Sequence, residues 1–306
     1  MSLRDATFRG RPLALPGEPP YPAAALVPWV GKRLFLPCGD PWVRGTGDDA
    51  HGYLDGARAG WTDHPEYMDF LDPRSPVFAL KSLERDLQLH HWARWLDAGT
   101  VLDVGCGIGR FTCALLDRGA TVYAIDPDLE SLRRCAWHAA DRPGALDLFW
   151  TSAHVLPDVQ VDLAVAAEVL CYVPDATGAL RAIASRVRPG GHVLISVEAR
   201  WGWAASQDAP AGSIEPALSG TGVVALPEDR WVRTYEADDV EELCASAELE
   251  VISLVSSHWI PDGPLEDTAP AGLDLPGLLA LEDRCRDHPV WGPLHRLWSG
   301  AARRVS

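Results

Sequence analysis

A short run of strand-forming residues that passes directly into three glycines constrains this chain more than any other segment. Residues 101–104 have the composition of a buried strand, and Gly105, Gly107 and Gly109 follow before a helix-forming segment. Glycine is needed where the backbone takes a positive φ or where a side chain would collide with a ligand. The segment therefore predicts a parallel strand whose terminal turn lies against a nucleotide-like ligand.

The spacing of these glycines distinguishes two kinds of ligand. Nicotinamide-binding folds usually show G-x-G-x-x-G, with pyrophosphate over a helix N-terminus, whereas this chain has G-x-G-x-G. Asp103 stands two residues before the first glycine, where its carboxylate would repel a pyrophosphate. A carboxylate in this place instead suits a ligand with a cationic amino-acid end, such as S-adenosylmethionine, which carries an ammonium and a sulfonium.

Strands and helices alternate regularly from residue 101 onward, which predicts a parallel, doubly wound sheet. The predicted strands are 101–105, 121–125, 146–150, 161–167, 191–197 and 249–255, with an antiparallel last strand at 297–305. The predicted helices are about 82–97, 109–118, 128–140, 176–187, 237–247 and 275–286.

The other segments are expected to surround this sheet. Residues 1–82 are rich in Pro and aromatic residues, and we expect an irregular arm at 11–41 followed by a short-helix cap. Residues 83–306 form the main domain, in which residues 199–236 interrupt the alternating pattern. Insertions of this length after a sheet strand are often functional lids.

Composition disfavours several classes of partner. The net charge of −16 disfavours nucleic acid, because phosphate neutralisation needs clustered Lys and Arg. No apolar run has the length of a membrane span, and the first residues lack the apolar segment of a secretory signal. Seven scattered cysteines without metal-ligand spacing predict a reduced, cytoplasmic protein with no metal site. We expect a monomer or a homodimer.

Further motifs follow the glycine turn at regular intervals. Asp126 ends the second strand, Glu168 stands near the end of the fourth, and a Pro-Gly-Gly turn at 189–191 leads into the fifth. Together these motifs resemble the class I S-adenosylmethionine-dependent methyltransferases, particularly the bacterial small-molecule branch, over about residues 83–258. The resemblance implies an α/β fold: a Rossmann-like, doubly wound, mostly parallel seven-stranded sheet with an N-terminal cap and a lid insertion after strand five.

The resemblance also implies which residues hold the cofactor. Asp126 would accept the ribose hydroxyls, although it can also cap the next helix. Ser152 stands where the family usually has an acidic residue that accepts from the adenine amino group, and Trp150 either stacks on adenine or belongs to the core. The predicted cofactor-binding residues are Asp103, Gly105, Cys106, Gly107, Gly109, Asp126, Pro127, Ser152, Ala153 and Glu168.

Three residues are candidates for catalysis. Tyr172 stands where many relatives have His, and its high ordinary pKa makes it better suited to orient an acceptor than to take a proton. His154 and His258 are candidate general bases, although a lone His is more often structural. Four aromatic residues are predicted to line the acceptor pocket: Tyr53, Tyr67, Trp201 and Trp203. Their rings can equally serve packing alone.

The predicted function is methyl transfer from S-adenosylmethionine to a small-molecule acceptor, with S-adenosylhomocysteine as product. Family analogy favours bacterial secondary metabolism. Two alternatives stay open: an enzyme of the same fold that uses the cofactor for cyclisation or other alkyl transfer, and a catalytically silent cofactor-binding partner. Glycine spacing disfavours a dehydrogenase. The missing basic face, and the absence of Asn/Asp-Pro-Pro-Tyr/Phe after the fourth strand, disfavour a nucleic-acid methyltransferase.

Overall fold

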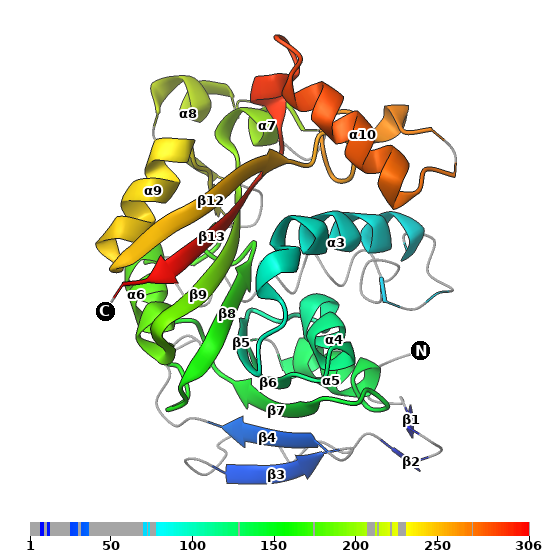
Figure 1. Cartoon of the computed structure of the whole chain (residues 1–306), viewed down its shortest axis with the longest axis vertical. Coiled ribbons are helices and arrows are strands. Elements are labelled where there is room, and N and C mark those ends of the chain that lie inside the picture. The colour runs from blue at the N-terminus through cyan, green and yellow to red at the C-terminus, as the bar shows by residue number, and fades with distance from the viewer. Residues whose placement is uncertain are drawn as a thin grey trace.

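A nine-stranded sheet, in the order β12-β13-β9-β8-β5-β6-β7-β4-β3, forms the centre of the computed structural model (Figure 1). The structure describes residues 7–8, 11–12, 25–29, 32–36, 70–71, 73, 78–127, 129–173, 175–206, 212, 214–220, 222–225, 231–270 and 272–305. Within these ranges, no helix is both long and apolar enough to cross a membrane.

Seven of the nine strands are the ones that the sequence predicts. They are β5 (Thr100–Val104), β6 (Thr121–Asp126), β7 (Ala145–Trp150), β8 (Val161–Ala167), β9 (Val187–Glu198), β12 (Leu249–Ser257) and β13 (Leu297–Arg304). β13 runs antiparallel to both β9 and β12, as predicted for the last strand. The mostly parallel, Rossmann-like core is therefore confirmed.

The N-terminal arm contains regular structure that the sequence did not predict. β4 (Lys32–Leu36) pairs in parallel with β7, and β3 (Ala25–Trp29) pairs antiparallel with β4. Pro28 is tolerated because β3 is the outermost strand, where one side of the ladder needs no donor. The expectation of an irregular arm is therefore wrong for these two strands. A separate antiparallel pair, β1 (Thr7–Phe8) and β2 (Arg11–Pro12), precedes these strands in the chain.

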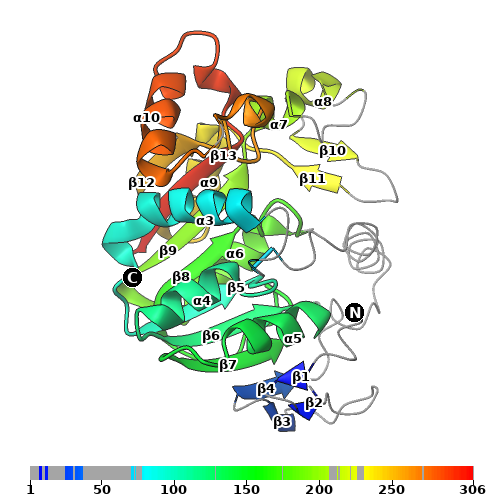
Figure 2. The same ribbon diagram turned by 90° about the vertical axis from the view of Figure 1, so that its right-hand side faces the viewer.

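Helices cover both faces of the sheet, because alternate side chains of each buried strand point to opposite faces. α4 (Arg110–Asp117) and α5 (Leu129–His138) lie side by side on one face (Figure 2). Their apolar side chains share a core cluster with residues of β5, β6 and β7. α6 (Ala176–Arg186) and α9 (Ala237–Ser246) contribute to the cluster on the other face.

Two further helical segments pack against each other beside the sheet. α3 (Phe78–Trp92) precedes β5 through a 3-10 turn at Ala93–Trp95, so the predicted domain boundary between residues 82 and 83 lies inside a helix. α10 (Leu275–Arg286) packs on α3 through an apolar cluster that includes Leu87, Trp259 and Leu278. Short 3-10 turns at Glu266–Thr268 and Gly292–Leu294 flank α10.

The insertion at 199–236 has secondary structure of its own. Its elements are α7 (Arg200–Ala204), α8 (Ile214–Ser219), β10 (Val223–Ala225) and β11 (Trp231–Arg233), the last two forming an antiparallel pair. Figure 2 shows these elements beyond the carboxyl end of β9, to one side of the sheet. Its role as a lid stays a prediction.

Candidate active site

The glycine turn after β5 lies where the strand order reverses between β5 and β8, the usual ligand position in such sheets. Gly105, Gly107 and Gly109 have φ values of 66°, 53° and 101°. A Cβ on Gly105 would lie 2.4 Å from a methyl carbon of Val169, and one on Gly109 would lie 3.1 Å from the sulfur of Cys135. A Cβ on Gly107 would meet no atom within 4 Å in the part of the chain that the structure describes. Packing therefore requires the outer glycines, whereas Gly107 presents open backbone.

Two carboxylates accompany this turn. Asp126, at the end of β6, accepts a hydrogen bond of 2.8 Å from the backbone N–H of Gly107. Asp103 is buried beneath the turn and accepts from the hydroxyl of Thr112 at 2.5 Å. Burial raises the pKa of Asp103 to about 6, against the opposing effects of Thr112 and Arg110. The turn thus has negative charge at the ends of both neighbouring strands.

The segment after β7 contributes mainly buried groups. Ser152 and Ala153 are both buried, and the hydroxyl of Ser152 accepts from the backbone N–H of His154 at 3.3 Å. Trp150 belongs to the core cluster of α4 and α5 and donates from its ring nitrogen to the carbonyl of Pro127 at 2.8 Å. Packing therefore accounts for Trp150, which favours the core alternative over adenine stacking.

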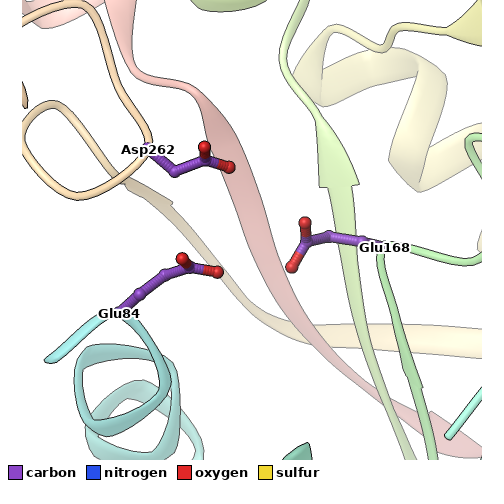
Figure 3. Close-up of side chains that lie close together, drawn as sticks. All are labelled: Glu84, Glu168 and Asp262. Carbon is purple, nitrogen blue, oxygen red and sulfur yellow. The ribbon is translucent and has the colours of Figure 1, made fainter. Parts of the chain in front are cut away.

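A network of ions joins the glycine turn to the neighbouring elements. Arg110, the first residue of α4, pairs with Glu168 at 2.5 Å and also with Glu84 of α3. Lys81 pairs with Glu84 at 2.7 Å and with Asp262 at 3.6 Å. Figure 3 shows Glu84, Glu168 and Asp262 pointing toward one another, and their oxygens lie within 4.8 Å of one another. The two cations balance most of this negative charge.

Sequence reasoning found one member of this network and missed the other four. Glu168 was predicted from its place after β8, where it takes a positive φ of 57°. Arg110 had a usable signal, because it directly follows the last glycine of the motif. Glu84, Lys81 and Asp262 had none, since they come from segments whose pairing depends on the tertiary fold.

Tyr172 belongs to a second buried polar group. Its hydroxyl donates to Glu198 Oε1 at 3.0 Å, and Glu198 forms a buried ion pair with Arg296. The backbone N–H of Glu198 is 3.0 Å from the sulfur of Cys171. Burial raises the pKa of the Tyr172 hydroxyl far above its ordinary value, so this residue is suited to orienting a ligand rather than to taking a proton. The sequence did not point to Glu198 or Arg296.

The two candidate histidines have different surroundings. His154 is partly exposed, and its Nε2 lies 3.1 Å from the backbone carbonyl of Asp175. His258, at the end of β12, is 1% exposed, and burial lowers its pKa to about 4. His258 is therefore neutral near pH 7, and its low pKa makes it a weak proton acceptor there.

The predicted acceptor-pocket residues separate into two pairs. Tyr53 and Tyr67 lie outside the described residues. Trp203 is 3% exposed and packs in the core cluster of α6 and α9, whereas Trp201, on α7, is partly exposed. The pocket role of these residues stays a prediction, and packing already accounts for Trp203.

Comparisons with curated proteins give partial matches. The chain is 40% identical over 100 residues to a ubiquinone biosynthesis O-methyltransferase of Aeromonas salmonicida, which covers 31% of this chain and 42% of that protein. It is 29% identical over 171 residues to a protein of the same name from Paracidovorax citrulli. This match covers 54% of this chain and 69% of that protein. This chain thus spans less than half the length of the Aeromonas protein.

Solved structures show the same fold. A 1,6-didemethyltoxoflavin-N1-methyltransferase from Burkholderia thailandensis is similar with a TM-score of 0.51 and 19% identity, over 84% of this chain and 90% of that one. The N-methyltransferase NodS from Bradyrhizobium japonicum is similar with a TM-score of 0.50 and 14% identity. The similarity covers 79% of this chain and 98% of that one.

A family model described as a methyltransferase domain matches residues 73–254, which is more than half of the chain. This match includes the glycine turn, Asp126 and the segment after β8, the motifs on which the resemblance was based. The chain therefore belongs to the methyltransferase-domain family, as the resemblance to class I S-adenosylmethionine-dependent methyltransferases predicted.

Proposed function

We propose that this chain binds S-adenosylmethionine at the glycine turn and transfers its methyl group to a hydroxyl of a small-molecule acceptor. The open backbone at Gly107 is the observation that carries the proposal. It lies between Asp103 and Asp126, at the topological switch of the sheet. A cationic adenosyl ligand fits this site, because both neighbouring strand ends carry carboxylates and the central glycine leaves room for close approach.

The residues around the turn have distinct tasks in this proposal. Asp126 would hold the ribose, Ser152 and Ala153 would bound the adenine, and Asp103 would favour the cationic amino-acid end. When bound, S-adenosylmethionine supplies an already activated methyl group on a positively charged sulfur. The protein then has to hold the acceptor in line with that methyl group and exclude water. Proximity of this kind supplies roughly 7–11 kcal/mol in favourable cases.

Oxygen is the acceptor atom that the names of the curated relatives support. The curated relatives are named O-methyltransferases of ubiquinone biosynthesis, which supports a hydroxyl-bearing small molecule but does not favour secondary metabolism in particular. A phenolic hydroxyl, with an ordinary pKa of about 10, needs a proton acceptor at neutral pH. The candidates that the sequence offers for this role are His154 and His258.

Product analysis tests this function against its alternatives. The protein is incubated with methyl-labelled S-adenosylmethionine and a panel of phenols and catechols, followed by mass spectrometry. We expect S-adenosylhomocysteine together with a product that is heavier by one labelled methylene unit. A cyclised product without added mass would support the non-methylating alternative. Cofactor binding without any S-adenosylhomocysteine would support the silent partner, and either result would overturn the proposal.

The affinity for S-adenosylmethionine is expected to increase as pH rises through about 6, the pKa of Asp103. Above this pH the carboxylate is negative and attracts the cationic end of the ligand. Each unit by which the ligand lowers this pKa strengthens binding roughly tenfold at high pH. A rise in pH has the opposite effect on the stability of the free protein. The reason is that the native state binds the proton of Asp103 more tightly than the unfolded chain does. The contribution of Asp103 to stability therefore decreases between the ordinary pKa of 3.8 and about 6.

Calorimetric titrations from about pH 5 to about pH 8 check this pH dependence. Asp103→Asn should remove it, because the amide does not titrate. Asp162→Asn is the control. Asp162 lies at the start of β8, away from the glycine turn, and accepts a hydrogen bond from the hydroxyl of Thr100. An affinity of the unmodified protein that does not change with pH would contradict a role for Asp103 in binding the cationic end.

A further inference from the structure

The chain that follows β8 packs directly on the glycine turn. A Cβ on Gly105 would collide with a methyl carbon of Val169, so the backbone of the turn and this side chain are in contact. The backbone N–H of Tyr172 donates to the carbonyl of Val169 at 3.0 Å, which closes a tight turn on the same residue. The four residues Leu170–Val173, the border segment, therefore lie directly beside the predicted cofactor site.

One short stretch of the insertion at 199–236 donates hydrogen bonds to the backbone of the border segment. The hydroxyl of Tyr235 donates to the carbonyl of Leu170 at 2.9 Å. The backbone N–H of Arg233 donates to the carbonyl of Cys171 at 2.8 Å, and the guanidinium of the same residue donates to the carbonyl of Val173 at 3.2 Å. The insertion thus supplies donors to three of the four carbonyl groups in the border segment.

The strand that leads into the insertion holds side chains of the same segment. Glu198, the last residue of β9, accepts from the hydroxyl of Tyr172 at 3.0 Å, and its backbone N–H lies 3.0 Å from the sulfur of Cys171. The carbonyl of Glu198 also accepts from the backbone N–H of Tyr235 at 2.8 Å, which joins the two ends of the insertion. The border segment is therefore held both where the chain enters the insertion and where it leaves.

Burial makes these hydrogen bonds hard to replace. Leu170 and Cys171 are fully buried, and Tyr235 is 4% exposed. The ring of Tyr235 belongs to the apolar cluster that α6 and α9 share with the sheet, so packing fixes the direction of its hydroxyl. A buried carbonyl that loses its donor is left unsatisfied, because water does not reach it. Each of these bonds therefore opposes displacement of the border segment.

The base of the insertion is packed too tightly to move as one unit. A Cβ on Gly202 of α7 would collide with the backbone carbonyl of His295, so the two backbones are in direct contact. The N–H of Ala199 donates to the carbonyl of Arg296 at 2.8 Å, and Ala199 also forms a β-bridge with Tyr235. An insertion that swung open as a whole would break these contacts together with the bonds to the border segment. Its two described ends therefore belong to the fixed body of the protein.

We propose that the insertion acts on methyl transfer through a fixed anchor, in which Arg233 and Tyr235 are positioning residues. They hold the border segment, and with it Tyr172, beside the cofactor turn. This inference rests on the proposed function. Neither positioning residue has to touch the cofactor or the acceptor, because a displacement of about 1 Å at a reacting site can lower the rate by about 100-fold. The hydrogen bonds of the anchor thus set the geometry in which the acceptor meets the methyl group.

Amide hydrogen exchange tests the anchor without any acceptor. Tyr235→Phe removes only the hydroxyl that donates to Leu170. We expect the amides of the border segment to exchange about five- to tenfold faster, the effect of losing one net hydrogen bond, while those of β5 and β6 keep their rates. Thr234→Val is the matched control, because it removes a buried hydroxyl that donates to the carbonyl of Gly222 within the insertion. Unchanged exchange of the border segment in Tyr235→Phe, or equally faster exchange in Thr234→Val, would overturn the anchor.

Kinetics test the positioning role. Tyr235→Phe should lower kcat by about 10- to 100-fold, while the KM for S-adenosylmethionine stays constant, because Val169 keeps its contact with Gly105. Arg233→Met, which removes the side-chain donor to the border segment, should show the same split between kcat and KM. Thr234→Val should retain the original kcat, although it loses a buried hydrogen bond of the same kind.

The outcomes separate the anchor from the proposed function. An unchanged kcat in Tyr235→Phe and Arg233→Met, or an equal loss in Thr234→Val, would overturn the positioning role and leave methyl transfer itself untouched. Absence of methyl transfer by the unmodified protein would overturn the proposed function, and the exchange measurement would still decide whether the insertion anchors the border segment.

Discussion

Replacing Gly107 by valine is expected to weaken S-adenosylmethionine binding by at least about 100-fold, equivalent to about 2.7 kcal/mol, while the sheet stays folded. The added side chain would enter the space that the proposal assigns to the cofactor. Its Cβ would meet no atom of the described residues within 4 Å, so the Cβ itself clashes with none of them. The remaining cost is the φ of 53°, which a β-branched residue tolerates poorly and which costs roughly 1–2 kcal/mol.

Gly119→Val is the matched control for this backbone cost. Gly119 has a φ of 81°, and its added Cβ also meets no atom within 4 Å among the described residues, but it lies beyond the other end of α4. Both variants should lose similar stability in thermal unfolding, and only Gly107→Val should lose cofactor affinity in calorimetry. Affinity like that of the unmodified protein in Gly107→Val, or an equal loss in both variants, would contradict the placement of the cofactor.

Arg296→Met is expected to lower the free energy of unfolding by about 3–5 kcal/mol, the usual effect of leaving one member of a buried ion pair uncompensated. Glu198 is 0% exposed and Arg296 is 5% exposed, so water does not solvate the remaining carboxylate. The double variant Glu198→Gln with Arg296→Met should recover part of this loss, because it buries no unpaired charge. Urea unfolding of the single and double variants measures both effects.

Arg303→Met, on the strand β13 that follows Arg296, is the control for this ion pair. Arg303 pairs with Glu250 at 2.5 Å, but both side chains are about half exposed, at 50% and 52%. Exposed pairs contribute about 0–1 kcal/mol, so this variant should be nearly as stable as the original protein. If Arg296→Met and Arg303→Met lowered the free energy of unfolding equally, the buried Glu198–Arg296 pair would contribute no more to stability than an exposed pair.

The sequence predicted those features whose signal is local. Each core strand is a short apolar run bounded by turn residues, and the glycine turn has its own spacing, so both were found within a few residues. β3 and β4 were missed because prolines dominate their surroundings, and a proline is compatible with a strand only when that strand lies at an edge. That position depends on pairing with β7, which no local pattern encodes.

The polar part of the site depends on partners that are far apart in the chain. Arg110 lies 58 residues from Glu168, and Tyr235 lies 65 residues from Leu170. Glu282 looks like a surface residue of an ordinary helix, yet it is 0% exposed because the turn after β12 folds over it. The sequence suggests His258 only as one of two candidate bases, and its contacts with Ser257 and Glu282 come entirely from the tertiary fold.

Calorimetric titration of the unmodified protein with S-adenosylmethionine, S-adenosylhomocysteine and NAD⁺ tests the cofactor assignment most directly. We predict that the two sulfur ligands bind at one site per chain and displace each other, while NAD⁺ gives no heat of binding. A preference for NAD⁺, or no binding of either sulfur ligand, would contradict the account.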